Sequence, residues 1–347
     1  MRTLTARDLN RALLARQCLL EPSTRPLARV LAQMGGLQAQ YAPAMYVGLW
    51  SRMAVLKREQ VTTALENRTV VQGTLLRVTI HLVTAADYWP VALAVRQARR
   101  EQILRTNRKG PTAAQYERAA AKLRAALAGG PMKRAEIDKL LGPEYRTGVG
   151  LWLDLVRVPP SGTWERRRAD LYGLAEDWVG PPTGTPTDGV ELLVRRYLGA
   201  FGPATRASVA DWAGLPVATV APVLDRLAPR RFRAEDGAEL YDLPRAPLPD
   251  PQTPAPVRFL PNWDAALLVH ARRALVLPEE YRPLVFHVRN PHSVSTFLVD
   301  GAVAGTWRYE SSRSGEGRIV IEEYRRLPAS VRREVDDEAA RLVAFHS

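Results

Sequence analysis

Residues 201–220 read FGPATRASVADWAGLPVATV, a pattern typical of two short helices joined by a tight turn. Thr205 suits the N-cap of the first helix, because its hydroxyl can accept a hydrogen bond from the backbone. Gly214 suits the turn, since glycine tolerates a left-handed backbone. Together with the segments on either side, the stretch predicts a helix-turn-helix unit with short helices over Glu191–Phe201, Arg206–Trp212 and Val217–Leu227.

A β-hairpin is expected directly after these helices. The dipeptide Asp236-Gly237 is a strong signal for a two-residue hairpin turn. Strand-forming residues flank it over Arg231–Glu235 and Ala238–Leu243. Helices followed by such a hairpin form a winged-helix unit, which we place at residues 187–245.

Helices followed by a hairpin are predicted twice more upstream. In residues 1–85, helical spacing gives way to RTVVQGTLLRVTIHLVT, which predicts a hairpin over Arg68–Thr84. In residues 86–180, helices lead to VRVPPSGTWERR, which predicts a hairpin turning at Pro160-Ser161-Gly162. The helices expected in these two units are Leu4–Leu19, Arg25–Leu37, Ala44–Met53, Gln60–Glu66, Ala86–Arg108, Thr112–Ala128, a short helix opened by Pro131 and Met132, and Arg146–Leu155.

The pattern changes after the third unit. Residues 181–189 and 244–256 are rich in Pro and Gly, as linkers are. Residues 257–347 then combine strand-like stretches with a terminal amphipathic helix over Ser330–Phe345. The predicted fold class is α+β, with three tandem winged-helix units and an α+β C-terminal cap whose strand-like stretches are Val285–Val288, Ser295–Val299, Ala302–Tyr309 and Arg318–Glu323.

The charge balance favours a partner made of phosphates. The 347 residues carry a formal net charge of +13, and 46% of them are hydrophobic, which is ordinary for a globular protein. Excess positive charge favours nucleic acid, because each neutralised phosphate releases counterions. The chain contains no signal-peptide pattern and no run of about eighteen apolar residues, so we expect a cytoplasmic protein with no membrane partner.

Metal and cofactor chemistry are not expected. Cys18 is the only cysteine, which excludes internal disulfides and multi-cysteine metal sites. The histidines lack the i, i+3 or i+4 spacing of helical metal ligands; they are His81, His270, His287, His292 and His346.

Residues 33–46, QMGGLQAQYAPAMY, place Gln38 and Gln40 on either side of one alanine. The Gly35-Gly36 pair can end the preceding helix, and Pro43 fits the first turn of the next. If the segment between them is extended, both amides point the same way and can hold a water or a polar ligand. If a helix instead continues through Gln38, both side chains are simply solvated. The local sequence leaves both alternatives open.

Six blocks spread along the chain carry a further signal. In order, they are LNRALLARQCLLEP (9–22), GLQAQYAPAMYVGLWSR (36–52), TIHLVTAADY (79–88), VRVPPSGTWERRRADLY (156–172), YLGAFGPATRASVADWAGL (197–215) and DGAVAGTWR (300–308). Together they resemble the bacterial winged-helix DNA glycosylases of the AlkZ/YcaQ-like family. The catalytic motif of that family is Gln, an aliphatic residue, then Gln or Asp. Gln38-Ala39-Gln40 matches its AlkZ-like form.

The resemblance implies hydrolysis of the N-glycosidic bond of N7-alkylguanine in duplex DNA, including bulky natural-product adducts and interstrand crosslinks. It also implies a C-shaped, basic concave surface around the duplex, with Gln38 and Gln40 as the catalytic residues. An N7-alkylguanine is cationic and leaves readily, so two amides need only orient a water toward the sugar. No lysine is evident near the motif to form a Schiff base. We therefore expect a monofunctional glycosylase that is a monomer and uses no cofactor.

Basic residues outside the motif are candidate DNA contacts. Arg77 and His81 lie four apart in the first predicted hairpin, so alternation would place both on one face beside Gln38. The remaining candidates are Arg166, Arg167 and Arg168 at the foot of the second wing, and Arg230, Arg231 and Arg233 in the third.

Structural roles are the alternative for many of these residues. A run of charges commonly forms a solvated face, and His81 can equally be a hydrogen-bonded core residue. Asn262, Asp264 and Trp307 are interpreted as holding the cap together. Gln72 departs from the family pattern, in which an arginine is expected.

Two other classes of function fit part of the sequence. A non-enzymatic transcription regulator could use the helix over Val217–Leu227 to read the major groove, but this helix is apolar and offers few side chains suited to base edges. A protein-interaction module leaves the net charge unexplained.

Overall fold

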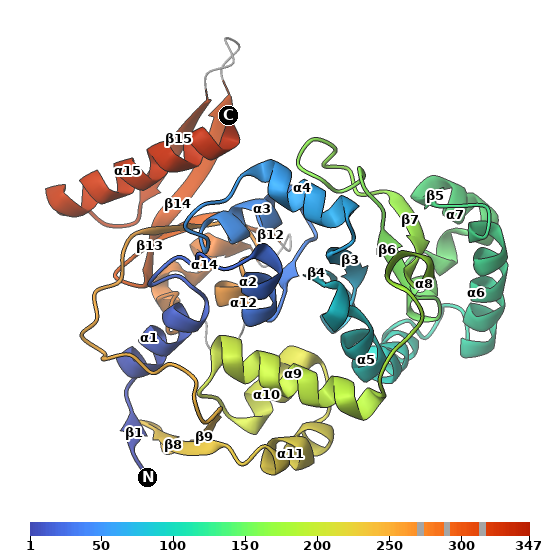
Figure 1. Cartoon of the computed structure of the whole chain (residues 1–347), viewed down its shortest axis with the longest axis horizontal. Coiled ribbons are helices and arrows are strands. Elements are labelled where there is room, and N and C mark those ends of the chain that lie inside the picture. Colours follow the sequence, from blue (N-terminus) through green and yellow to red (C-terminus); the bar gives the residue numbers. More distant parts are fainter. Residues whose placement is uncertain (269–273, 288–291, 312–316) are drawn as a thin grey trace.

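Figure 1 shows a computed structural model of the chain, which describes residues 1–268, 274–287, 292–311 and 317–347. Helices and short strands are mixed along the whole chain, which confirms the α+β class. The α-helices are α1 (Ala6–Arg16), α2 (Leu27–Gln33), α3 (Ala42–Trp50), α4 (Arg58–Glu66), α5 (Ala85–Thr106), α6 (Ala113–Leu127), α7 (Arg134–Leu141), α8 (Ala175–Val179), α9 (Pro186–Phe201), α10 (Arg206–Ala213), α11 (Val217–Arg226), α12 (Ala265–Leu268), α14 (Arg282–Val285) and α15 (Ala329–His346).

The hairpins of the first two predicted units join in one sheet. Its strand order is β2-β4-β3-β6-β7-β5. The contact between the units is the antiparallel pair β3–β6, in which Gln72 lies opposite Arg157. The strands are β2 (Leu37–Gln38), β3 (Val70–Thr74), β4 (Ile80–Thr84), β5 (Met132–Lys133), β6 (Leu155–Arg157) and β7 (Leu171–Leu174).

The helix-turn-helix predicted at residues 201–220 is confirmed. The Thr205 hydroxyl accepts a hydrogen bond of 3.0 Å from the backbone N–H of Ser208 at the start of α10. Gly214 ends α10 with a φ of 68°. The following hairpin, β8 (Arg230–Ala234) and β9 (Glu239–Asp242), turns at Gly237, whose φ is 88°. β1 (Thr3–Leu4) adds to the edge of β8 in parallel, a pairing that local patterns could not indicate.

The C-terminal part contains its own sheet. β10 (Arg258–Leu260), β13 (Thr296–Val299), β14 (Ala302–Ser311) and β15 (Gly317–Glu323) lie side by side in that order, and α15 packs on them. A two-stranded pair, β11 (Phe286–His287) and β12 (His292–Ser293), completes the strands. In Figure 1 the C-terminal helix lies at the upper left of the molecule and the N-terminus at the lower left.

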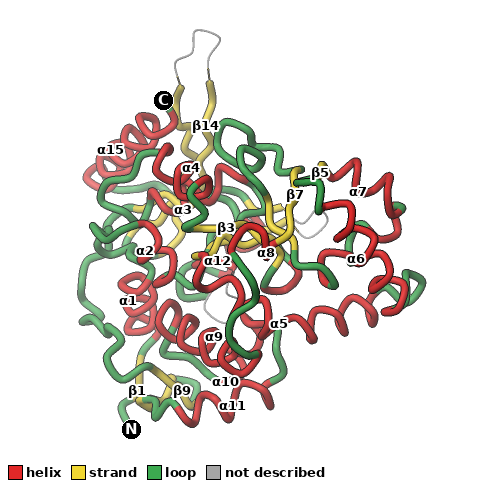
Figure 2. Tube along the Cα trace, turned by 45° about the vertical axis from the view of Figure 1, so that its right-hand side comes forward, coloured by secondary structure: helices red, strands yellow, loops and turns green. Residues whose placement is uncertain are grey.

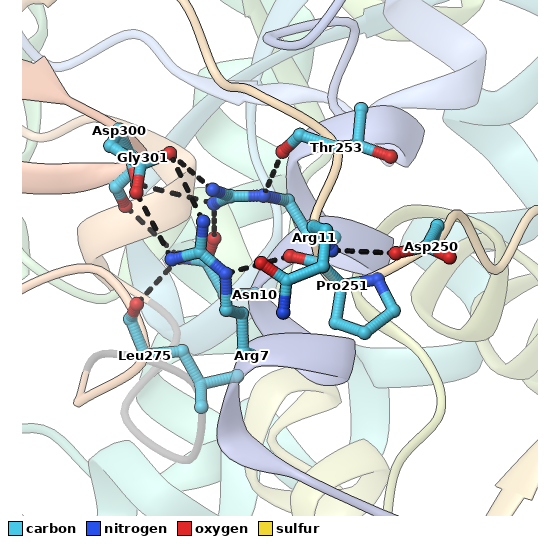
Figure 3. Close-up of polar contacts among 10 residues, drawn as sticks. Arg7, Asn10, Arg11, Asp250, Pro251, Thr253, Leu275, Asp300 and Gly301 are labelled. Carbon is cyan, nitrogen blue, oxygen red and sulfur yellow. Dashed lines mark hydrogen bonds and ion pairs between the residues drawn. The ribbon is translucent and has the colours of Figure 1, made fainter.

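Polar contacts connect α1 to the turn between β13 and β14 (Figure 3). The Arg11 side chain is fully buried; it donates to the Thr253 carbonyl at 2.6 Å and forms an ion pair with Asp300. Arg7 forms a second ion pair with Asp300, at 3.0 Å. Asn10 donates to the Gly301 carbonyl at 3.0 Å. These contacts hold the first helix, the 244–256 segment and the C-terminal sheet together.

The second predicted unit differs most from the prediction. The helix predicted over Arg146–Leu155 is wrong: the range contains one 3₁₀ turn, Val149–Leu151, and ends at the first residue of β6. Glycine disfavours a helix interior, and a Cβ on Gly148 would come within 2.4 Å of the Tyr116 ring. The close packing against Tyr116 therefore requires a residue that is a poor helix former. Met132 belongs to β5, which pairs with β7, and the short helix begins only at Arg134. In both views α6 and α7 lie at the end of the molecule away from α1 (Figures 1 and 2).

Candidate active site and DNA-binding surface

The segment with the two glutamines is extended. Gly35 and Gly36 end α2 with φ values of 76° and 84°, which residues other than glycine rarely adopt. Gln38 then pairs with His81 of β4, and the Ala39 N–H donates to the Ile80 carbonyl at 2.8 Å. α3 starts at Ala42, with Pro43 in its first turn. Of the two alternatives left open by the sequence, the extended one is therefore correct.

The glutamine side chains lie on the solvent side of this segment. Leu37 and Ala39 are buried, with 4% and 0% of their surface exposed, whereas Gln38 is half-buried and Gln40 is exposed. Because alternate residues of an extended segment point the same way, the two amides lie on the side opposite Leu37 and Ala39. Neither amide forms a hydrogen bond with any residue that the structure describes. Both remain available to a ligand.

Arg157 stabilises the backbone of the glutamine segment. Its guanidinium is buried, and Nη1 donates to the Ala39 carbonyl at 2.9 Å. Burial lowers the pKa of this guanidinium from its ordinary value. A charge-assisted hydrogen bond to the carbonyl between the two glutamines restricts the backbone that carries them. Arg157 is not among the residues predicted from the sequence; the signal available for it is a single arginine within the apolar run LVRV of a predicted strand.

His81 is a buried, neutral neighbour of Gln38. Its Nδ1 lies 3.0 Å from the Thr79 carbonyl, so Nδ1 carries the proton in this contact. Burial, and to a lesser extent the nearby charge of Arg77, lowers the pKa of His81 to about 3. The imidazole is therefore uncharged at neutral pH and cannot pair with a phosphate as a cation.

Arg77 occupies a different setting from the one predicted. The strands β3 and β4 are separated by a 3₁₀ turn over Leu76–Val78, in which Arg77 has a φ of 50°. The turn, and not strand alternation, sets the direction of its side chain, so the predicted shared strand face is wrong. The guanidinium donates to the Trp212 carbonyl at the end of α10. Arg77 thus links the first hairpin to the helix-turn-helix.

The three arginines of the second hairpin lie in its loop and not at its foot. The strands β6 and β7 are connected by residues 158–170, so the loop is much longer than the predicted Pro160–Gly162 turn. Arg166, Arg167 and Arg168 are all exposed. Arg167 lies 5.5 Å above the Trp164 ring, and Arg168 forms an ion pair of 2.8 Å with Asp170. Among the described residues, the Arg166 side chain has no partner.

The arginines of the third hairpin are mostly paired. Arg230 is partly buried and forms an ion pair with Asp242. Arg231 forms an ion pair of 3.3 Å with Glu239. Arg233 is exposed, and its side chain contacts no described residue. In Figure 1 this hairpin lies at the lower left, far from the loop before β7 at the top, so the two arginine groups do not form one patch.

Comparison with known proteins identifies the family. A sequence profile described as "DNA glycosylase AlkZ-like" matches residues 31–345, which is most of the chain. The chain belongs to the AlkZ-like DNA glycosylase family. No curated protein sequence matches it.

A solved AlkZ structure has a similar fold. The structure described as "Streptomyces sahachiroi DNA glycosylase AlkZ" superposes with a TM-score of 0.79, covering 99% of this chain and 96% of that chain at 20% identity. At this identity the similarity concerns the fold alone. Membership of the AlkZ-like family makes DNA the substrate and favours an enzyme over a transcription regulator.

Three residues of this AlkZ-like chain were interpreted as structural, and two of them are. Asp264 forms a fully buried ion pair of 2.8 Å with Arg52, and the Trp307 indole donates to the Leu260 carbonyl at 2.9 Å. Asn262 instead lines a cavity of about 330 Å³ beside Tyr41, and its side chain forms no hydrogen bond with a described residue. Gln72, found where the family pattern has arginine, is buried and donates to the Gly162 carbonyl at 3.0 Å.

Two further predictions from the sequence concern the histidines as metal ligands and the absence of a membrane-spanning helix. His270 lies outside the described residues, as do the side chains of His287 and His292. His346 is described and stacks on Tyr309 with 4.1 Å between ring centroids. None of the described helices combines the length and apolar character needed to cross a bilayer.

Proposed function

We propose that this protein is a monofunctional DNA glycosylase that hydrolyses the N-glycosidic bond of cationic N7-alkylguanine in duplex DNA. The observation that carries the proposal is the pair of amides at Gln38 and Gln40, which have no hydrogen-bond partner in the described part of the chain and are held by an extended segment whose intervening residue, Ala39, is fully buried. Neutral amides suit a reaction in which the leaving group is already activated by its own positive charge.

The amides act on the attacking water. Their oxygens accept hydrogen bonds from the water and aim its lone pair at the anomeric carbon. As the new C1′–O bond forms, the C1′–N9 bond breaks and its electron pair neutralises the charge on the purine. The water then releases a proton to solvent. A fixed pair of acceptors lowers the barrier because it needs no reorganisation during the reaction.

The surroundings of the motif favour direct hydrolysis. His81, the closest titratable side chain by strand pairing, is buried and neutral at pH 7, so it does not serve as a cationic acid. None of the residues that flank the motif or pair with it, Leu37, Ala39, Tyr41 and Ile80–Leu82, is a lysine. Water is therefore the nucleophile, and strand cleavage through a Schiff base is not expected.

The substrate includes bulky lesions and crosslinks. A guanine tethered to the opposite strand cannot easily be flipped out of the duplex. In this proposal three tandem winged-helix units (residues 1–85, 86–180 and 187–245) and the cap (257–347) form a C-shaped, basic concave surface on a monomer. The adduct stays in the major groove, while Gln38 and Gln40 approach the sugar from the minor-groove side.

The test is a comparison of leaving groups in single-turnover reactions. Duplexes would carry N7-methylguanine, a bulky N7 monoadduct, an N7–N7 crosslink, uracil or 8-oxoguanine. We expect release of the free base and an abasic site from the three cationic lesions and no release of the two neutral ones. Efficient uracil excision, or activity on the methyl lesion alone, would contradict the proposal and favour an enclosed pocket that takes a flipped base.

A further inference from the structure

A groove lined by arginines lies beside α2, outside all the DNA contacts predicted from the sequence. It is formed by α2, α9 and the segment 243–247, and has a volume of about 710 Å³. None of its lining residues is an aspartate or a glutamate. Six arginines line it: Arg16, Arg25, Arg29, Arg195, Arg196 and Arg245.

Half of these arginines are already neutralised by carboxylates. Arg16 is fully buried and forms an ion pair of 2.7 Å with Asp242. Arg196 pairs with Asp87 of α5 at 2.8 Å, and Arg195 pairs with Glu191 at 2.7 Å. The first pair joins α1 to β9, the second joins α9 to α5, and the third lies on the surface of α9.

The other three arginines form no such contact. Arg25, Arg29 and Arg245 are exposed, and no side-chain hydrogen bond or ion pair joins them to a described residue. They come from three places in the sequence: just before α2, within α2, and in the segment after β9. Three unpaired cations facing one groove repel one another, which weakens folding slightly unless an anion binds there.

The groove is close to the proposed catalytic segment. Gln33, at the end of α2, lines it, and Gln38 follows five residues later. Five residues span at most about 18 Å even when fully extended. Successive phosphates on one DNA strand rise by about 3.4 Å, so this distance corresponds to roughly five nucleotides.

We infer that this groove binds the phosphodiester backbone of the duplex flanking the lesion, with Arg25, Arg29 and Arg245 as the phosphate ligands. The inference rests on the proposed function for the identity of the lesion, but not for the contact itself. The ligand is a chain of phosphates, because three spread guanidinium groups match several anions in a row better than one. Contacts of this kind fix the register of the enzyme on DNA and carry no base specificity.

The experiment combines a protein change with a matching DNA change. The groove variant is Arg25→Ala/Arg29→Ala/Arg245→Ala. The control variant, Arg118→Ala/Arg326→Ala/Arg333→Ala, removes the same charge from exposed arginines that contact no described side chain elsewhere. The DNA would carry ordinary phosphates or uncharged methylphosphonate linkages three to seven nucleotides from the lesion. Affinity is measured at several salt concentrations.

We expect the protein change and the DNA change to weaken binding through loss of the same contacts. The groove variant should bind normal duplex at least tenfold more weakly, and its logarithmic salt dependence should fall by roughly 0.9 for each phosphate that is no longer neutralised. Neutral linkages should weaken the wild type and the control variant but not the groove variant. Arg→Lys at the same three positions should restore most of the salt dependence, which shows that the missing charge and not misfolding is responsible.

Two outcomes would overturn the inference. One is a groove variant that binds as tightly as the wild type with the same salt dependence. The other is an equal weakening in the groove and control variants, which would reflect total charge only. Absence of base release in every protein would instead contradict the proposed function and leave the binding result standing.

Discussion

The glutamine segment and the β8–β9 hairpin are both short extended elements with polar side chains, yet they use those side chains in opposite ways. In the hairpin, Arg230 and Arg231 are paired with Asp242 and Glu239. In the glutamine segment, the amides of Gln38 and Gln40 have no hydrogen-bond partner among the described residues, while the backbone between them is fixed by Arg157. Paired side chains stabilise the fold, whereas unpaired side chains on a rigid backbone can bind a ligand or act on a substrate. Substitutions in the hairpin should therefore change the free energy of unfolding, and substitutions of the two glutamines should change the rate of base release.

The largest effect should come from Asp242→Ala. Asp242 is fully buried between Arg16 and Arg230, so its removal leaves the fully buried Arg16 without a counter-ion. Breaking such a pair costs about 3–5 kcal/mol of unfolding free energy. Chemical denaturation measures the loss, and base release by the folded fraction should stay near the wild-type rate. A loss below about 1 kcal/mol would refute the structural role given to this hairpin.

The free energy of unfolding should depend on pH because His81, next to Gln38, is buried and neutral. The folded protein holds this imidazole neutral, with a pKa of about 3, whereas the unfolded chain takes up a proton below about pH 6.5. Proton uptake therefore favours unfolding, and the stability from this group is fully present above pH 6.5 and decreases as the pH falls toward 3. The loss is on the order of 1.4 kcal/mol per pH unit, or roughly 2 kcal/mol between pH 6.5 and 5. His81→Asn should unfold with a shallower pH dependence; equal slopes in denaturation series would disprove the assignment.

Removing either amide should slow catalysis without loosening the fold. Gln38→Ala and Gln40→Ala should each reduce single-turnover release of N7-methylguanine at least tenfold, or roughly 1.4 kcal/mol of barrier. Because neither side chain forms a hydrogen bond with a described residue, unfolding free energy and affinity for undamaged DNA should hardly change. Gln33→Ala serves as the control for losing a nearby amide, since that amide is used within the fold. Wild-type rates in both motif variants would remove the catalytic assignment.

The smallest effect belongs to the exposed pair of the hairpin. Arg231 and Glu239 lie 3.3 Å apart with about half of each side chain in solvent, at 51% and 40% exposure. Such pairs contribute about 0.2–1 kcal/mol. A double-mutant cycle of Arg231→Ala and Glu239→Ala should give a coupling in this range, with no change in base release. A coupling above about 2 kcal/mol would mean that the hairpin depends on its surface charges as well as on Asp242.

Local signals predicted well whatever depends on a few neighbouring residues. The Thr205 cap, the Gly214 turn and the Asp236-Gly237 hairpin are all present, because each is set by the backbone preferences of one or two residues. For the glutamine segment the local sequence left a helical and an extended form open, and the structure has the extended form, in which Gly35 and Gly36 follow α2 with positive φ.

Features that depend on residues far apart in the sequence could not be predicted from the sequence. Arg157 reaches Ala39 from a separate hairpin, 118 residues away, and nothing near either residue indicates the contact. In the range of the predicted helix over Arg146–Leu155, Gly148 leaves no room for a Cβ beside the ring of Tyr116, which lies 32 residues earlier in α6. The arginine groove requires α2 and α9 to pack side by side, and Arg25, Arg29 and Arg245 look like ordinary surface residues in the sequence.

The buried pair between Arg52 and Asp264 has a consequence for synthesis on the ribosome. Arg52 follows shortly after α3, the helix into which the glutamine segment leads, and its partner is made 212 residues later. At the usual 5–20 residues per second, the N-terminal region waits roughly 10 to 40 s for that carboxylate. Until then Arg52 can be buried only as an uncompensated charge, which strongly disfavours the finished packing around α3. We therefore expect a chain that stops before residue 264 to lack the stable packing around α3 that holds the proposed catalytic segment.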